Sequence, residues 1–539
     1  MRIRDELGRL RTLDSNAFLT VTGAPLPKSP LATGENQTAG DRESLLLLGL
    51  GPEPARLTTF IEAWRSRAAG AVGSVYWIEC PDFEAQMPQD WKNHIPAHWT
   101  RLHVSDRDTP DLLTRIKNIP PAHIWRYEPG AQLFSAFWGP LLGAVQAKLI
   151  GCAPLQASSR TVLLPGARGD LLTLELEQGV AQSGFTPLRL PHATAKGTEA
   201  SPLLQMLRDE RPALFLSVNL RGLDAEGNLF RLLQACGVPV ALWFVDNPWH
   251  ILSSLRTPWW REAALFVTDA SFLAPLRAHG AAFVRHLPLG TWMHPAVPRA
   301  QSAPLHPLVF VGRASFPAHD RFFSGCHLSE ALLKEGCAQL HTSTPPHAHW
   351  WEQRLGIESC WPGTAIRQAG YGAECCATAR RRDWLLAANP LGLTVFGDDA
   401  WKKTLPMGCD VRPALDYYNA LPAVYSEARY SLNVTSLLLP EGLTQRHFDV
   451  WAAGGFLFSD PTPGLSLFPP ELVEPITVTS PRELASRMRY IERDSLLRYH
   501  LIKEWQAYLN REHTYKTRFE TLLHEISAES AYSYAFQAS

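Results

Sequence analysis

PEGLTQRHFDVWAAGGFLFSD, residues 440–460, is the stretch that says most about the fold of this chain. A proline and a glycine near its start end an extended segment, and residues 443–453 after them have the composition of a helix. Paired glycines at 454–455 stop that helix, and the apolar run 456–458 is typical of a buried strand. The sequence therefore predicts a helix that leads from one strand of an α/β sheet to the next.

Two acids in this stretch, Glu441 and Asp449, are separated by seven residues, and Arg446 lies between them. The first turn of a helix carries unpaired N–H groups and the positive end of its dipole, so it favours a diphosphate, and Arg446 adds a full charge there. Arg446 and Asp449 are three residues apart and share one helix face. An ordinary amphipathic helix with a glycine C-cap is the alternative interpretation of the same residues.

Length and composition limit the class of protein. At 539 residues the chain is too long for one ordinary core and predicts about three domains. A net charge of −1 and a pI near 7 give no overall basic surface, so neither nucleic acid nor acidic lipid is a favoured partner. The first residues lack the apolar core of a signal peptide, and no apolar run is long enough to span a bilayer. We therefore expect a cytoplasmic protein without a transmembrane segment, of unknown oligomeric state.

Cysteine and histidine give no metal signature. The nine cysteines are scattered without a C-x-x-C pair, so we expect reduced thiols. His341, His347 and His349 lie in a loop rich in threonine and proline, where solvated side chains are the expectation and a metal site the alternative. The eighteen tryptophans favour packing over stacking on sugars.

Strand-like and helical segments alternate along the chain, which indicates parallel sheets covered by helices. We divide it into an accessory α/β domain at 1–150, a second α/β series at 155–300, a third at 301–500, and final helices at 501–539, with a proline-rich linker at 291–307. In the first series Gly49-Leu50-Gly51 follows a strand but lacks the third glycine of a dinucleotide turn. In the second series, polar residues follow the apolar runs, where ligands of open sheets collect: Asn219, Asp246, Asn247, Thr268 and Asp269.

Seven segments between about 200 and 525 together resemble the CgeB-like, spore-maturation-type family of bacterial glycosyltransferases, which belongs to the GT-B superfamily. They include GVPVALWFVDNPWH, FVTDASFLAPLRAHG, PLVFVGR, VFGDDAW, YYNALPAVYSEARYSLNVTS, GLTQRHFDVWAAGGFLFSD and HTYKTRF. The resemblance implies an α/β fold with a GT-B-like pair of Rossmann-like domains facing across a cleft, and the first 150 residues lie outside it as an additional N-terminal α/β domain. It also implies transfer from a nucleotide-diphosphate sugar without metal or other cofactor, to a protein acceptor such as flagellin or to a surface polysaccharide.

The resemblance extends to a Glu-x₇-Glu element in which the first acid reaches the donor sugar and the second holds the ribose. Here Glu441 and Asp449 match it, although aspartate is one methylene shorter than glutamate. Candidate donor-binding residues lie at this element and at strand ends of the third series: Gly312, Arg313, Gly397, Asp398, Asn433, Thr435, Glu441, Gly442, Leu443, Thr444, Arg446 and Asp449. Tight turns alone would also explain the glycines at 312 and 397, and a surface position would explain Arg313.

On the acceptor side, an inverting reaction needs a base, and Asp246 at a strand end is our first candidate, with His250 second. A turn or helix cap is the alternative role of Asp246 before Asn-Pro. A retaining reaction would let the donor phosphate take the proton. Two other hypotheses stay open: a scaffold that binds nucleotide sugar or glycan without turnover, and a methyltransferase-like cofactor site at Gly49-Leu50-Gly51.

Overall fold

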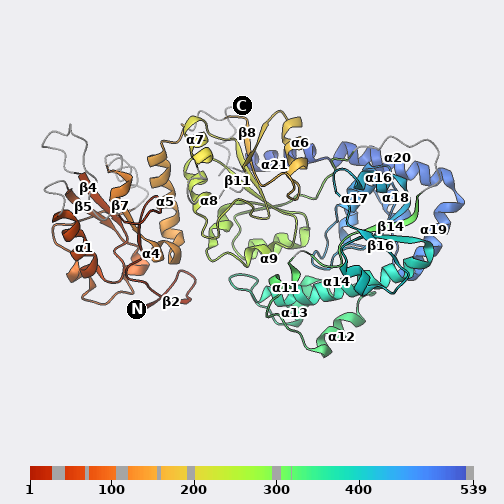
Figure 1. Ribbon diagram of the computed structural model, residues 1–539, viewed down its shortest axis with the longest axis horizontal. Coiled ribbons are helices and arrows are strands. Elements are labelled where there is room, and N and C mark those ends of the chain that lie inside the picture. The colour runs from red at the N-terminus through yellow and green to blue at the C-terminus, as the bar shows by residue number, and fades with distance from the viewer. Residues whose placement is uncertain are drawn as a thin grey trace.

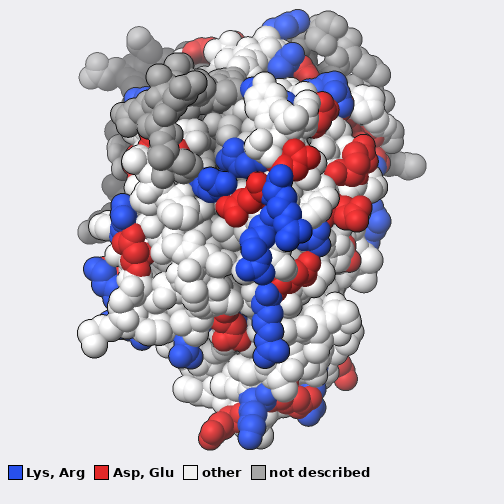
Figure 2. All heavy atoms as spheres, turned by 90° about the vertical axis from the view of Figure 1, so that its right-hand side faces the viewer, with Lys and Arg blue, Asp and Glu red and all other residues white. Residues whose placement is uncertain are grey.

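The computed structural model describes residues 1–26, 43–66, 72–104, 119–153, 159–190, 201–293, 305–316 and 318–529. Three α/β units follow one another along the long axis of the molecule (Figure 1). Among the described helices, none is long and apolar enough to cross a membrane. The surface around α19 (Leu484–Arg493) and α20 (Ser495–Glu512) carries basic and acidic side chains next to each other, with one continuous basic run (Figure 2), as expected for a chain with a net charge of −1.

The first unit contains a five-stranded sheet of order β3-β7-β4-β5-β6, in which only β3 runs antiparallel to its neighbour. Its strands are β3 (Phe18–Thr20), β4 (Glu43–Leu48), β5 (Val72–Ile78), β6 (Thr100–Arg101) and β7 (Ile124–Tyr127), and a hairpin of β1 (Arg2–Arg4) and β2 (Leu10–Thr12) precedes them. Its helices are α1 (Pro54–Ser66), α2 (Pro81–Glu84), α4 (Glu128–Leu133) and α5 (Ser135–Ile150). The leucine run of β4 is fully buried, because helices and neighbouring strands enclose a central parallel strand.

Side chains fill the turn after β4. The ring of Tyr127 lies so close to Gly51 that a Cβ there would be 3.2 Å from it. The Trp91 indole donates to the Gly51 carbonyl (3.0 Å), and the buried Glu79 carboxyl accepts from the Leu50 N–H (2.8 Å). Packing and these hydrogen bonds account for Gly49-Leu50-Gly51.

The second unit is a parallel six-stranded sheet of order β13-β12-β11-β10-β8-β9. Its strands are β8 (Thr161–Pro165), β9 (Thr186–Leu190), β10 (Leu214–Val218), β11 (Val240–Phe244), β12 (Ala264–Val267) and β13 (Phe283–His286). Its helices are α6 (Thr173–Gln182), α7 (Ser201–Asp209), α8 (Asn228–Ala235), α9 (Pro248–Leu252) and α10 (Leu273–Ala278). Every residue of β10, β11 and β12 is buried, which confirms the expectation drawn from their unbroken apolar runs.

The third unit is a parallel five-stranded sheet of order β16-β15-β14-β17-β18, the arrangement of a Rossmann-like domain. Its strands are β14 (His306–Val311), β15 (Leu393–Gly397), β16 (Asp410–Pro413), β17 (Ala428–Asn433) and β18 (Leu457–Ser459). Its helices are α11 (His319–Phe322), α12 (Glu330–Ala338), α13 (Ala348–Arg354), α14 (Ile366–Ala388), α15 (Ala400–Thr404), α16 (Leu421–Glu427), α17 (Arg446–Ala452), α18 (Pro470–Val473), α19 (Leu484–Arg493) and α20 (Ser495–Glu512). Together the second and third units form the expected GT-B-like pair of Rossmann-like domains.

The chain crosses between these two domains twice. Residues 291–293 lead from the second domain toward the third, and residues 294–304 of the expected linker lie outside the described residues. The last helix, α21 (Tyr515–Ala528), returns to the second domain and packs on α6 (Figure 1). Thr291 and Thr514 form a parallel bridge where the two crossings meet. Residues 484–512 form two helices rather than one, because Asp494 ends α19 and caps α20 through the Leu496 and Leu497 N–H groups.

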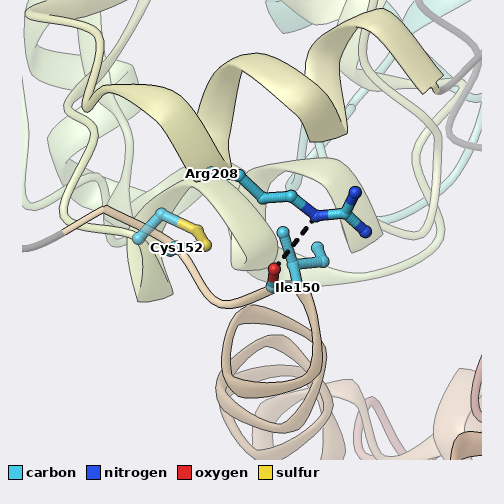
Figure 3. Close-up of a disulfide and its surroundings, with 4 residues drawn as sticks. Ile150, Cys152 and Arg208 are labelled. Atoms are coloured by element: carbon cyan, nitrogen blue, oxygen red, sulfur yellow. Dashed lines mark hydrogen bonds between the residues drawn. A yellow bond between two sulfur atoms is a disulfide. The ribbon is translucent and has the colours of Figure 1, made fainter.

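The first unit docks on the second through α5 and α8. A Cβ at Gly143 of α5 would lie 2.5 Å from the Arg231 carbonyl oxygen of α8, so the two helices touch backbone to backbone. Cys152 and Cys236, at the ends of these helices, form a disulfide with a Cα–Cα distance of 6.0 Å (Figure 3). Arg208 Nε donates to the Ile150 carbonyl beside it (3.1 Å). The expectation of reduced thiols is therefore wrong for these two cysteines, whose partner cannot be read from spacing alone.

Candidate functional site

The order of strands in the third domain reverses between β14 and β17, and open α/β sheets bind ligands at such a switch point. Arg446, the first residue of α17, bridges the ends of both strands. Its Nη1 donates to the Val311 carbonyl (2.6 Å) and its Nε to Asn433 Oδ1 (2.8 Å). Gly312 lies beside the same guanidinium, 3.2 Å from it when a Cβ is added. The structure thus brings together three of the predicted donor-binding residues at the switch point: Gly312, Asn433 and Arg446.

Two further arginines from α14 lie at the same strand ends. Arg380 is buried and pairs with Asp460 after β18 (2.8 Å), and Arg381 pairs with Glu374 (3.1 Å). Arg381 also donates to the Ala314 carbonyl after β14 (2.9 Å). Burial, with a contribution from the charge of Arg381, lowers the pKa of Arg446, although an arginine stays protonated at neutral pH. None of the ion pairs between described residues includes Arg446, so this edge of the sheet carries an unneutralised cation.

Buried polar groups hold Arg446 in place. Asn433 donates to Thr435 Oγ1 (3.1 Å) and Ser459 Oγ (3.1 Å), and the Thr435 N–H and hydroxyl both donate to Asp460 Oδ1 (2.9 Å each). The sequence predicts that Asn433 and Thr435 bind the donor; both are instead buried and bonded internally, so they support the arginine rather than face a ligand. Asp460, which was not predicted, is signalled only by its position directly after a strand.

His447 completes this network as a neutral ring. Burial lowers its pKa to about 3. Its Nδ1 accepts from the Thr444 N–H (3.0 Å), so the ring proton is on Nε2, which lies 2.9 Å from Ser459 Oγ. These two hydrogen bonds of His447, with Thr444 and with Ser459, fix the turn that precedes Arg446.

The helix start is less open than the sequence predicts. Helix α17 runs from Arg446 to Ala452, shorter than the predicted 443–453. The Thr444 N–H is bonded to His447, and the Glu441 N–H donates to Asp269 Oδ2 of the second domain (2.9 Å). Gly442 and Leu443 are buried. The prediction that the amides of residues 442–444 grip a diphosphate is therefore wrong for Thr444, and the positive charge of Arg446 remains as the main anion-binding feature.

Asp449 faces the junction of the two domains instead of an open ribose site. It is buried and accepts hydrogen bonds from Thr291 Oγ1 (3.0 Å), Tyr417 OH (2.7 Å) and Gln445 Nε2 (3.0 Å). Burial raises its pKa to about 7. The expected ribose contact is thus corrected: the carboxyl is fully occupied within the protein. Glu441 is half-buried at the start of the same stretch.

The remaining predicted residues at the strand ends have packing roles. A Cβ at Gly397 would lie 2.3 Å from the Gly312 carbonyl oxygen, to which Trp401 Nε1 donates (2.9 Å). Asp398 accepts from the Ala314 N–H (3.3 Å) and so orders the turn after β14. Arg313 is exposed. Close packing rather than a tight turn explains both glycines, since neither has a positive φ: a Cβ at Gly312 would meet the side chains of Phe310 and Arg446, and one at Gly397 would meet the Gly312 carbonyl.

On the facing domain, Asp246 follows β11 and is exposed to water. Asn219 Nδ2 donates to its carboxyl (2.7 Å), and the protein that crowds around it raises its pKa. The next residue, Asn247, caps α9 by accepting from the Trp249 N–H (3.0 Å) and donates to the Leu438 carbonyl of the third domain (3.2 Å). Asp246 therefore lies at the end of β11, beside the contact between the domains, and the pKa of its carboxyl is raised.

His250 does not share this accessibility. Its Nε2 is buried without a hydrogen-bond partner, against Gly370 of α14, and the ring packs on Phe322 (5.4 Å between centroids) and Phe323 (6.1 Å). Burial lowers its pKa to about 4. The prediction of His250 as a second catalytic candidate is wrong in this structure, since Nε2 reaches no surface.

The histidines of the 341–349 loop separate into two environments. His341 pairs at the surface with Asp383 (2.9 Å), as expected for a solvated side chain. His347 and His349 are only partly exposed, and the Ala348 N–H between them donates to the Leu437 carbonyl (2.8 Å), which ties this loop to the segment between β17 and Glu441. Over the described part of the chain, no group of three or more His, Cys, Asp or Glu is arranged to hold a metal ion.

The third domain thus carries cationic side chains at the switch point of a Rossmann-like sheet, the place where such sheets bind ligands. Residues 380–524, about a quarter of the chain, match a family model described as glycosyl transferase-like. This region includes Arg380, Arg381, Arg446 and Asp460. No curated protein matches the chain.

Several solved structures are similar to the chain. The T4 phage β-glucosyltransferase with its UDP-glucose substrate has 9% identity and a TM-score of 0.37, over 69% of this chain and 98% of its own. Anabaena Alr3699/HepE in complex with UDP-glucose has 10% identity and a TM-score of 0.38, over 68% and 100%. The spinosyn forosaminyltransferase SpnP has 12% identity and a TM-score of 0.32, over 68% and 99%. Because the TM-scores are below 0.5, these likenesses carry no weight for substrate or mechanism.

Proposed function

We propose that this protein is a glycosyltransferase that transfers a sugar from a nucleotide-diphosphate sugar to an acceptor hydroxyl. The observation that carries the proposal is the unneutralised Arg446 at the switch point between β14 and β17, with Arg380 and Arg381 beside it. The glycosyl transferase-like match of residues 380–524 supports it independently.

The chemistry follows from the charge of the leaving group. As the bond between the sugar and the diphosphate breaks, negative charge grows on the diphosphate oxygens, and a fixed cation stabilises that state more than the ground state. Arg446 is fixed by Val311 and Asn433 through two of its nitrogens, so little reorganisation is needed when the charge develops. Glu441 remains the residue proposed to face the donor sugar, and Asp246 the one proposed to face the acceptor.

Four further proposals about this protein rest on the family resemblance alone. They are membership of the CgeB-like family, a bacterial source, a cytoplasmic location, and a protein acceptor such as flagellin or a surface polysaccharide. Metal-independent transfer belongs to the same group of proposals.

A panel of UDP-, GDP- and dTDP-sugars tests the proposal. We expect one of them to raise the unfolding temperature, because a ligand that binds only the folded state stabilises it. We also expect release of the nucleoside diphosphate at an unchanged rate in EDTA. If no sugar nucleotide binds or is turned over, the proposal is wrong; if EDTA stops turnover, metal independence is wrong.

A second candidate is a scaffold that binds nucleotide sugar without transfer. It is favoured by Asp449, which is held in the domain junction instead of a ribose site. Thermal stabilisation by a sugar nucleotide without nucleotide release or product would support this alternative.

A further inference from the structure

A small pocket lies where the chain crosses between the two domains. It has a volume of about 40 Å³ and is lined by residues of α6, of the crossing segment 291–293, of the last turn of α20 and of the first turn of α21. A Cβ at Gly179 of α6 would lie 2.7 Å from the Tyr515 carbonyl oxygen, so the backbones of α6 and α21 touch at the pocket. The described residues that line it include none from the strand ends around Arg446, so it is separate from the switch point.

Two residues that line this pocket carry polar atoms without a partner in the described part of the chain. Glu175 is 1% exposed, and its Oε2 accepts from the Tyr418 hydroxyl (2.8 Å), but its Oε1 is buried without a hydrogen bond. The indole Nε1 of Trp292 is likewise buried and unpartnered, although the ring packs on Tyr417 and Tyr418 (5.9 and 5.3 Å between centroids). Burying a polar atom without a partner is costly, so an acceptor and a donor left open at one pocket indicate a polar group that enters it.

Polar side chains continue from the inside of the pocket to the surface. Glu175, Gln178 and Gln182 are three and four residues apart along α6 and lie on one face of the helix. Glu175 is buried, Gln178 is half-buried and Gln182 is exposed. Asn510, in the last turn of α20, lines the pocket as well. A carboxyl, an indole N–H and three carboxamides offer both acceptors and donors, the set that fits a ligand with several hydroxyl groups.

Charge and size limit the class of ligand further. Lys516 lines the same pocket as Glu175, so one charge of each sign is present and neither an anion nor a cation is selected. Moving a charged ligand out of water without a matched partner is costly, and an uncharged ligand is therefore favoured. The volume has room for about three water-sized groups. One edge of a sugar ring fits this space, and the remainder of the ring stays outside, toward Gln182.

We infer that this pocket is a binding site for an uncharged saccharide, separate from the donor site at the switch point. One hydroxyl of the sugar donates to Glu175 Oε1 and another accepts from Trp292 Nε1, while the carboxamides of α6 and α20 bind the part of the ligand outside. The saccharide is either a portion of the acceptor or a free ligand, since both present the same hydroxyl groups. Through Glu175 it contacts the second domain, and through Trp292 it contacts the segment that leads to the third.

Titration of the full chain without nucleotide tests this inference. The probes are the methyl glycosides of glucose, galactose, mannose, rhamnose and N-acetylglucosamine, followed by saturation-transfer NMR, and we expect one or more of them to bind. Trp292→Phe keeps an aromatic ring but removes the N–H, and it should raise the Kd roughly 2- to 10-fold, the range for one neutral hydrogen bond. Glu175→Ala should raise the Kd about 10-fold or more, because a carboxylate makes the stronger hydrogen bond. Trp350→Phe, at a half-buried position on α13, is the matched control and should leave the Kd unchanged.

A second variant separates the pocket from the domain junction. Tyr418→Phe removes the hydrogen bond to Glu175 Oε2 and leaves Oε1 in place, so it should raise the Kd less than Glu175→Ala. An equal or larger effect of Tyr418→Phe would make the junction, rather than the pocket, responsible for binding and would overturn the inference. If no glycoside binds, or if Trp292→Phe and Glu175→Ala bind like the wild type, the pocket holds water only and the inference is wrong. A cooperative thermal transition in each variant shows that it is folded.

The source of the saccharide and the proposed function are tested separately from the site. A bound glycoside that gains the mass of a sugar when donor is added is a portion of the acceptor, and one that stays unchanged in an active preparation is a free ligand; both outcomes support the site. A wild type that binds a glycoside but neither binds nor turns over any sugar nucleotide would overturn the proposed function and still support this inference.

Discussion

The hydroxyl of Tyr418 in the third domain donates a 2.8 Å hydrogen bond to Glu175 in the second. Its neighbour Tyr417 donates to Asp449 (2.7 Å), which also accepts from Thr291 where the chain leaves the second domain. Tyr418 thus joins the two domains directly, while Tyr417 and Thr291 hold the buried Asp449 at their junction. Burial raises the pKa of both carboxyls, so the junction is a site where protonation and domain contact are coupled.

Asp449→Asn should change how stability depends on pH. The folded-state pKa of Asp449 is about 7 and the unfolded value is 3.8, so the folded state binds the extra proton. The stability from this group is fully present below pH 3.8 and is lost as pH rises to about 7, by roughly 4 kcal/mol at most. An asparagine side chain at this position cannot titrate. Urea unfolding at pH 5 and pH 8 should therefore show that the variant loses less stability than the wild type over this interval.

The exposed Glu471→Gln is the control for this measurement, since its carboxyl is not enclosed. It should follow the wild-type pH dependence. Equal losses of stability in Asp449→Asn and wild type between pH 5 and pH 8 would contradict the raised pKa.

Arg446→Gln should weaken donor binding most among the strand-end variants. A charge-assisted hydrogen bond to phosphate contributes about 1.5–3 kcal/mol, so the Kd for the nucleoside diphosphate should rise roughly 10- to 100-fold. Arg313→Gln, at an exposed position just after β14, should change the Kd less than threefold. Calorimetric titration with UDP, GDP and dTDP measures both. A larger effect at Arg313 than at Arg446 would place the anion outside the switch point.

The parts of the fold that depend on local pattern could be predicted from sequence. The unbroken apolar runs of β10, β11 and β12 and the Gly454 stop after α17 follow from periodicity and turn chemistry, and the structure has them. The direction of a side chain could not be predicted in the same way. Asp449 and Arg446 share a helix face in sequence, but Thr291 and Tyr417 enclose Asp449 at the domain junction, while Arg446 lies at the strand ends.

Long-range contacts explain the residues that sequence reasoning missed. Arg380 and Arg381 lie in a run of three arginines without any motif, and only the packing of α14 brings them to the ends of β14 and β18. The sequence predicts a solvated His349 because its neighbours are threonine, proline and histidine. Its burial comes from Phe272 and Leu437, which are distant in sequence. Asp460 alone had a usable signal, its place directly after a strand.

The disulfide between Cys152 and Cys236 predicts a thiol count. In unfolded protein kept from reductants, a thiol reagent should titrate seven cysteines, the ones that are free in the structure, rather than nine. After reduction the count should rise by two. Cys152→Ser should leave eight free thiols under both conditions, because its partner is released. Nine thiols in the unreduced wild type would show that the pair is not bonded.

Gly143→Ala should loosen the first unit from the rest of the protein. Alanine is normally the better helix former by about 1 kcal/mol, so the substitution would stabilise an isolated α5. Here the added Cβ would lie 2.5 Å from the Arg231 carbonyl oxygen, a backbone atom that cannot move without shifting α8. We therefore expect net destabilisation of about 1–3 kcal/mol, typical of overpacking. Limited proteolysis should cut the variant faster between the first and second units.

Gly139→Ala is the matched control, one turn earlier on the same helix. Its added Cβ would approach Arg231 Nε at 2.9 Å, which belongs to the flexible end of a side chain and can move. Its cost should be smaller than that of Gly143→Ala, and proteolysis should stay close to the wild-type rate. Equal effects of the two substitutions would contradict the greater cost that we assign to the backbone contact at Gly143.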